Sequence, residues 1–176
     1  MRVIDGSVVG RGCVARMIHV VYKGRVLPLA WVVRRGTTGH VPEVPHIALM
    51  AQVRELIPPG ARVVVLGDGE CDGIDLPHTL QEAGWLYVCR TGCNVTASGN
   101  GTPFCLDTVG AGITPGTLVA FPQASVTRKA YGPVLLLCCW ATGYQEPLYW
   151  ISNMSSAEKA CRLYAQRFRI ATCFSD

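Results

Sequence analysis

The feature that most constrains the fold is the run Arg62-Val-Val-Val-Leu-Gly67, which is followed at once by Asp68. A short, continuous apolar run of this kind is typical of a strand that is covered on both faces, as in a sheet flanked by helices. Asp68 then lies at the carboxyl end of a buried strand. The run therefore predicts an α/β fold and makes Asp68 a candidate site residue.

The residues on either side predict the element order βββαβαβ. β-branched and aromatic residues dominate the early strands, and Lys23-Gly24 is a hairpin signal between two of them. The predicted strands are residues 1–7, 14–22, 25–34, 62–67 and 85–90, and the predicted helices lie within residues 45–58 and about 74–83. Asp5 stands at the end of the first predicted strand. These elements form a mixed sheet flanked by helices.

The composition changes after residue 90, where short apolar runs alternate with many Gly, Pro, Ser and Thr residues. This pattern predicts a β-rich insertion over residues 91–149. The next segment opens with Ser155-Ser-Ala-Glu158, which is a capping-box pattern, and predicts a helix that runs to the end of the chain. We therefore divide the chain into a first part of the core (1–90), an insertion (91–149) and a C-terminal part of the core that carries the last helix (150–176).

Composition limits the functional classes. A chain of 176 residues with 49% hydrophobic content fits one globular domain, and a net charge of +4 permits a polyanionic partner without requiring one. Nine cysteines, an odd number, and the lack of a signal peptide favour a reducing cytoplasm over a disulfide framework. Cys89 and Cys93 lack a second Cys/His pair at zinc-finger spacing, and no apolar run is long enough for a membrane helix. We expect a soluble protein.

Two acids at strand ends suit one particular chemistry. Two-metal phosphoryl transfer needs hard oxygen ligands that converge on two divalent ions roughly 4 Å apart. If the strands that carry Asp5 and Asp68 pair in one sheet, their carboxylates lie side by side at its edge, and a third acid normally comes from a nearby helix. Read alone, each aspartate could instead be a turn residue before glycine.

The C-terminal segment carries a more specific signal, Arg167-Phe-Arg-Ile-Ala171-Thr-Cys-Phe-Ser-Asp176, preceded by Tyr164. It resembles the last catalytic helix of bacterial insertion-sequence transposases of the fourth family, which carry the signature Tyr-x2-Arg-x3-Glu-x6-Lys. Four further stretches resemble other parts of that family: Ile4-Asp5-Gly6-Ser7, Leu66-Gly-Asp68-Gly-Glu-Cys-Asp72-Gly, Leu27-Pro-Leu-Ala-Trp31 and Gly84-Trp-Leu-Tyr-Val-Cys-Arg90. In this register Ala171 occupies the position of the catalytic glutamate.

The resemblance implies an RNase H-like core with a β-stranded insertion before the last helix. It also implies a DDE transposase that uses two Mg²⁺ or Mn²⁺ ions, held by Asp5, Asp68 and the missing glutamate, for DNA strand cleavage and strand transfer. Tyr164 and Arg167 would contact DNA, and helical spacing places both on one face with Ala171. The partners implied are transposon ends, target DNA and a second copy of the chain, in the bacterial cytoplasm at the nucleoid.

Several alternatives remain open at this stage. Alanine preserves a helix but cannot bind a metal, so we expect this form to be inactive, through either deliberate substitution or natural decay. Glu70 could act as a substitute ligand. The signature lysine would lie beyond Asp176, which suggests a catalytic-domain fragment. The rival functions are a non-catalytic DNA-binding or interaction module on the same scaffold and a structure-selective nuclease.

Overall fold

The computed structural model describes residues 2–10, 12–22, 25–35, 44–69 and 73–167. The strands are β1 (Arg2–Gly10), β2 (Cys13–Tyr22), β3 (Arg25–Arg35), β4 (Val64–Gly67), β5 (Leu86–Thr91), β6 (Thr96–Gly99), β7 (Thr102–Cys105), β8 (Leu118–Val126), β9 (Tyr131–Cys139) and β10 (Leu148–Ser152). The helices are α1 (Val44–Glu55), α2 (Asp75–Glu82), α3 (Leu106–Ala111) and α4 (Ala157–Ala165). The predicted α/β class, with a mixed sheet and flanking helices, is confirmed.

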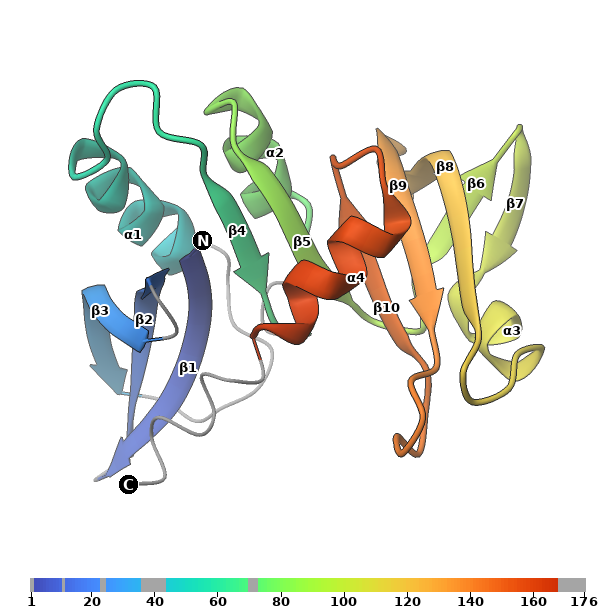
Figure 1. Cartoon of the computed structure of the whole chain (residues 1–176), viewed down its shortest axis with the longest axis horizontal. Coiled ribbons are helices and arrows are strands. Elements are labelled where there is room, and N and C mark those ends of the chain that lie inside the picture. Colours follow the sequence, from blue (N-terminus) through green and yellow to red (C-terminus); the bar gives the residue numbers. More distant parts are fainter. Residues whose placement is uncertain (1, 11, 23–24, 36–43, 70–72, 168–176) are drawn as a thin grey trace.

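The strands of the described residues form one sheet in the order β3-β2-β1-β4-β5-β10-β9-β8-β6-β7 (Figure 1). β1 runs parallel to β4, and β4 runs parallel to β5, whereas the other neighbouring pairs are antiparallel. Parallel neighbours need a crossover connection, and α2 supplies it between β4 and β5. The carboxyl ends of β1, β4 and β5 therefore lie at the same edge of the sheet.

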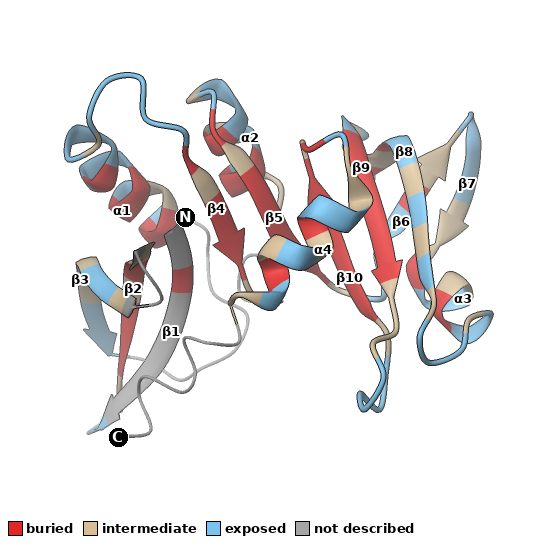
Figure 2. Ribbon diagram, viewed as in Figure 1, coloured by how far each residue is buried: buried red, intermediate tan, exposed pale blue. Residues whose placement is uncertain are grey.

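The central strands build a core on each face of the sheet, because successive side chains point to opposite sides. In β5, Tyr87 and Cys89 belong to the core that α1 and α2 cover, whereas Val88 belongs to the core under α4. In β10, Ile151 belongs to the core under α1 and α2, and Trp150 belongs to the core under α4. Figure 2 shows these central strands as the most continuously buried part of the sheet. We call the two sides the α1/α2 face and the α4 face.

A polar clamp joins β10 to β5 just beyond the end of their backbone pairing. The Tyr87 N–H donates to Asn153 Oδ1 at 3.0 Å, and Asn153 Nδ2 donates to the Trp85 carbonyl at 2.9 Å. The buried Ser152 hydroxyl also donates to the Tyr87 carbonyl. The clamp extends a strand junction that connects residues far apart in the sequence.

The last helix is shorter than the sequence predicts. Ser156, not Ser155, is the N-cap: its hydroxyl oxygen accepts the Lys159 N–H at 3.2 Å, and its backbone is extended. The helix ends at Ala165, because the N–H groups of Gln166 and Arg167 bond three residues back rather than four. The predicted continuation over residues 168–176 lies outside the described residues.

The insertion does not form a separate layer. Its strands β6–β9 extend the sheet beyond β10, and the boundary placed at residues 149–150 falls inside β10. The short helix α3 was not predicted, because its sequence, Leu-Asp-Thr-Val-Gly-Ala, has too few residues to show helical periodicity.

Candidate functional site

Two predicted acids occupy neighbouring backbone positions at the carboxyl edge of the sheet. β1 and β4 pair in parallel through Val3 and Leu66, and Asp5 and Asp68 each follow two residues later. Continuing the same register therefore places the two aspartates side by side. The side-by-side placement of the two carboxylates stays a prediction, because the printed pairing of β1 with β4 ends at Val3 and Leu66.

Asp5 is not at the end of its strand, so that part of the prediction is wrong. β1 runs on to Gly10, because its antiparallel partner β2 continues to pair with it through Ser7 and Val8. Asp5 lies inside this ladder, opposite Met17. Its side chain is outside the described part of the structure.

Asp68 is paired with an arginine from the other end of the chain. Arg167 Nη2 donates to Asp68 Oδ2 at 2.9 Å, across a sequence separation of 99 residues. The two side chains are 19% and 17% exposed, so most of each is withdrawn from water. This partial burial makes the ion pair stronger than a fully solvated surface pair.

Tyr164 fixes α4 to the sheet beside this ion pair. Its ring is buried and packs against the Trp150 indole, with ring centroids 4.8 Å apart. Burial raises the pKa of Tyr164 to about 12, although the nearby Arg167 guanidinium lowers it in part. Tyr164 therefore stays a neutral phenol and acts as packing support for the segment that carries Arg167.

The structure brings together only part of the predicted C-terminal constellation. Tyr164 lies on α4, whereas Arg167 lies two residues past its last helical residue, in the closing turn. Ala171 lies outside the described residues, and so does Glu70, the suggested substitute ligand. The shared helix face with Ala171 stays a prediction.

A second arginine, Arg90, continues the row of Asp5 and Asp68 onto β5. The sequence analysis did not assign it to the site. β4 and β5 pair in parallel through Gly67 and Cys89, and the next residues are Asp68 and Arg90. Arg90 also pairs in register with Trp150 of β10. Its position directly after the buried run of β5, matching that of Asp68 after β4, was the available signal.

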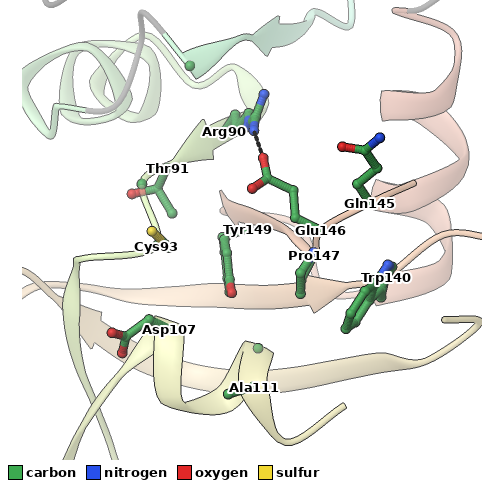
Figure 3. Close-up of a pocket in the computed structure, with 13 residues that line it drawn as sticks. Arg90, Thr91, Cys93, Asp107, Ala111, Trp140, Gln145, Glu146, Pro147 and Tyr149 are labelled. Atoms are coloured by element: carbon green, nitrogen blue, oxygen red, sulfur yellow. Dashed lines mark ion pairs between the residues drawn. The ribbon is translucent and has the colours of Figure 1, made fainter. Parts of the chain in front are cut away.

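A pocket of about 640 Å³ opens beside this row, between β5, α3 and the connection from β9 to β10 (Figure 3). Gly69 and Arg90 form its wall nearest to Asp68, and Tyr149 lies within it. Figure 3 shows Arg90 and Glu146 pointing toward one another, with an Nη2–Oε1 distance of 3.8 Å. Asp107 of α3 lines the pocket too, so the cavity carries both charge signs.

Two buried polar residues lie on the α1/α2 side of the core. Arg16 of β2 is 4% exposed, and His46 in the first turn of α1 is 1% exposed. Burial and the Arg16 charge lower the pKa of His46, while Asp68 opposes this shift. His46 is therefore neutral at physiological pH. No metal-ligand spacing surrounds His46 in the sequence, and its burial depends on how α1 packs.

The donor chemistry at the edge fits a divalent cation only in part. Asp68 supplies the hard oxygen that Mg²⁺ prefers, and Asp5 occupies the adjacent backbone position. Within the described ranges, no three His, Cys, Asp or Glu residues are grouped closely enough to hold a metal. Ala171 has no ligand atom to add.

In comparisons with known proteins, no family model matches the chain, and no curated protein matches it either. None of the helices in the described part of the chain is long and apolar enough to span a lipid bilayer.

Proposed function

We propose that this chain is the catalytic core of a cut-and-paste DNA transposase with an RNase H-like fold, held in an inactive form by Ala171. The intact site would cleave DNA strands and transfer a freed 3′ end to target DNA. The proposal rests on the C-terminal motif together with the geometry around Asp68.

The topology supports the RNase H-like part of this proposal. The first five strands follow the order β3-β2-β1-β4-β5, in which an antiparallel meander is followed by two strands parallel to β1. This is the arrangement expected of such a core, with its acids at the carboxyl ends of the central strands. The remaining strands are inserted between β5 and α4, as the proposed family relationship requires.

The observation that carries the proposal is the contact between Asp68 and Arg167. The sequence motif predicted that an acid after β4 and an arginine near the C-terminus act at one site, and the two groups lie 2.9 Å apart. A planar guanidinium beside a carboxylate is well suited to a second anionic partner, such as a DNA phosphate. In an active form Asp68 would hold a divalent cation, and Arg167 would then be available to that phosphate.

The charge at this edge supports a polyanionic substrate. β3 runs in the same direction as β1, so its terminal residues Arg34 and Arg35, which are both exposed, lie at the same edge as Asp68. Arg90 and Arg167 flank Asp68 itself. Four arginines at one edge favour phosphate contacts that do not depend on sequence.

Divalent cations bound by Asp5 and Asp68 would supply the charge stabilisation and the activated water that phosphodiester cleavage requires. The chain's own residues would then orient the DNA. Arg167 would hold a phosphate, and Tyr164 would keep the Arg167 segment against Trp150. Replacing the acid expected at Ala171 by a methyl group removes one ligand and one negative charge.

The test is to compare this chain with its Ala171→Glu variant in a plasmid-nicking assay with Mn²⁺. Restoring the third carboxylate should raise the cleavage rate by two or more orders of magnitude, because the metal regains an anchor. Adding Asp68→Asn to Ala171→Glu should abolish the gain. The Ala171→Gln variant is the matched control, since it restores the size of the side chain without the charge.

Equal nicking by the original chain, Ala171→Glu and Ala171→Gln would refute the proposal. Circular dichroism on every variant shows whether a loss of activity is a loss of fold.

A non-catalytic DNA-binding module is the second candidate, and the Asp68–Arg167 pair favours it to a degree. An acid already neutralised by a guanidinium at 2.9 Å can be stable without metal. Mn²⁺ binding to this chain, followed by its electron spin resonance signal, separates the two functions. Binding that Asp68→Asn removes supports the catalytic core, and DNA binding without Mn²⁺ binding supports the module.

A further inference from the structure

Arg90 shares the α4 face with the groups already assigned to the site. It follows Val88 by two residues in β5 and pairs with Trp150, and both of those residues belong to the core under α4. A Cβ built on Gly69 would lie 3.9 Å from Arg90 Cδ, which is ordinary van der Waals contact. Arg90 is therefore next to Asp68 both in register and in space.

The partner of Arg90 comes from the inserted half of the sheet. Glu146 lies on the connection between β9 and β10, and its carboxylate is 3.8 Å from the Arg90 guanidinium. This connection has a defined shape, because Trp140 Nε1 donates to the Tyr144 carbonyl at 2.9 Å and Gly143 has a φ of +91°. The insertion thus presents an acid to a cation at the edge of the site.

We propose that Arg90 is a phosphate-binding residue of the site and that Glu146 occupies its guanidinium when no DNA strand is bound. This proposal rests on the proposed function, because it takes DNA as the substrate. The phosphate replaces Glu146 as the anion on Arg90, with no covalent step. The insertion therefore regulates how readily a strand enters the site.

The observed pair is suited to such an exchange. The side chains of Arg90 and Glu146 are 40% and 76% exposed, so water screens their attraction and either group can be displaced at low cost. The Asp68–Arg167 pair is far less exposed. An arriving phosphate can therefore displace the carboxylate on Arg90 more easily than the carboxylate on Arg167. The pocket beside it leaves room for the displaced Glu146 side chain.

A double-mutant cycle on DNA affinity tests this proposal. The probe is a fluorescently labelled DNA duplex of arbitrary sequence, measured by anisotropy without added divalent metal at several salt concentrations. Arg90→Gln should weaken binding about tenfold and lower the salt slope by about one, because one phosphate contact is lost. Glu146→Gln should strengthen binding about two- to fivefold, because Arg90 is released.

The decisive value is the coupling between the two changes. In the Arg90→Gln background, Glu146→Gln should have little effect, because there is no guanidinium left to release. Lys129→Gln is the control for Arg90→Gln, and Glu82→Gln is the control for Glu146→Gln. Each control removes a charge of the same sign at an exposed position away from this edge. They should shift affinity much less.

Two results would overturn the proposal and can be told apart. If the chain binds the duplex but Arg90→Gln and Glu146→Gln act additively or match their controls, the gating proposal is wrong and the proposed function stands. If no form binds DNA in low salt, both fail together.

Discussion

The two halves of the sheet follow different construction rules. From β1 to β5 the sheet contains parallel neighbours, with α1 and α2 packed on one face. From β10 to β7 all neighbouring strands are antiparallel, and the helix α3 connects β7 to β8. Antiparallel strands can be joined by short turns, whereas parallel ones cannot. The first half therefore brings strand carboxyl ends together, and the second half brings loops to them.

This difference explains how the site is assembled. Asp68 and Arg90 come from strand ends of the first half, Glu146 comes from a loop of the second half, and Arg167 comes from the segment after α4. β10 joins the halves, because it pairs with β5 on one side and with β9 on the other. The geometry of the site thus depends on the strand that both halves share.

The largest effect is expected from a cavity in β10. Ile151 is 2% exposed and pairs in register with Cys89 and Leu136, so Ile151→Ala should lower the free energy of unfolding by about 2–5 kcal/mol. Val33→Ala on the edge strand β3 is the control, because Val33 is 51% exposed and should cost about 0.5 kcal/mol or less. Denaturant unfolding followed by circular dichroism measures both.

The same experiment can break the comparison between the halves. If β10 makes the sheet one cooperative unit, tryptophan fluorescence and circular dichroism should report a single coincident transition in the unmodified chain. Two separate transitions would mean that the halves unfold independently and that β10 does not couple them.

A smaller effect is expected where α3 packs on the second half. Gly110 leaves no room for a side chain, because an added Cβ would overlap the Tyr149 hydroxyl and lie 3.3 Å from Pro147. Gly110→Ala should therefore lower the free energy of unfolding, by an amount near the lower end of the range of about 1–3 kcal/mol that is typical of overpacking. Gly112→Ala is the matched control, since its added Cβ meets its nearest atom at 3.5 Å. Equal melting temperatures for the two variants would show that α3 moves freely on β10.

Local sequence signals predicted the first half of the sheet well, because its cues are short in range. The apolar run ending at Gly67 predicted β4, and its parallel register with β1 gave the neighbouring positions of Asp5 and Asp68. The length of β1 was not predictable in the same way. It depends on pairing with β2, which continues past Asp5.

The rest of the site depends on contacts between distant segments, which local patterns do not contain. Arg90 gains its partner because the connection between β9 and β10 returns to β5, and no spacing in the sequence relates Arg90 to Glu146. The burial of His46 likewise follows from the packing of α1 on the sheet. The pairing of Arg167 with Asp68 was not predicted, because the resemblance assigned Arg167 to DNA and no local spacing relates it to Asp68.

The smallest effect expected is a change of stability with pH that compares the two faces of the sheet. On the α4 face, burial raises the pKa of Tyr164 from 10.0 to about 12. Because the folded-state pKa is the higher one, this contribution is fully present below pH 10 and is lost as the pH rises toward 12. Tyr149, on the α1/α2 face, has its pKa raised to about 12 as well and contributes in the same direction.

The Tyr164→Phe variant should therefore lose less stability than the unmodified chain between pH 10 and pH 12. Denaturant unfolding at each pH measures this difference. Parallel stability curves for the two forms would mean that Tyr164 is not shielded from water at the base of the Arg167 segment.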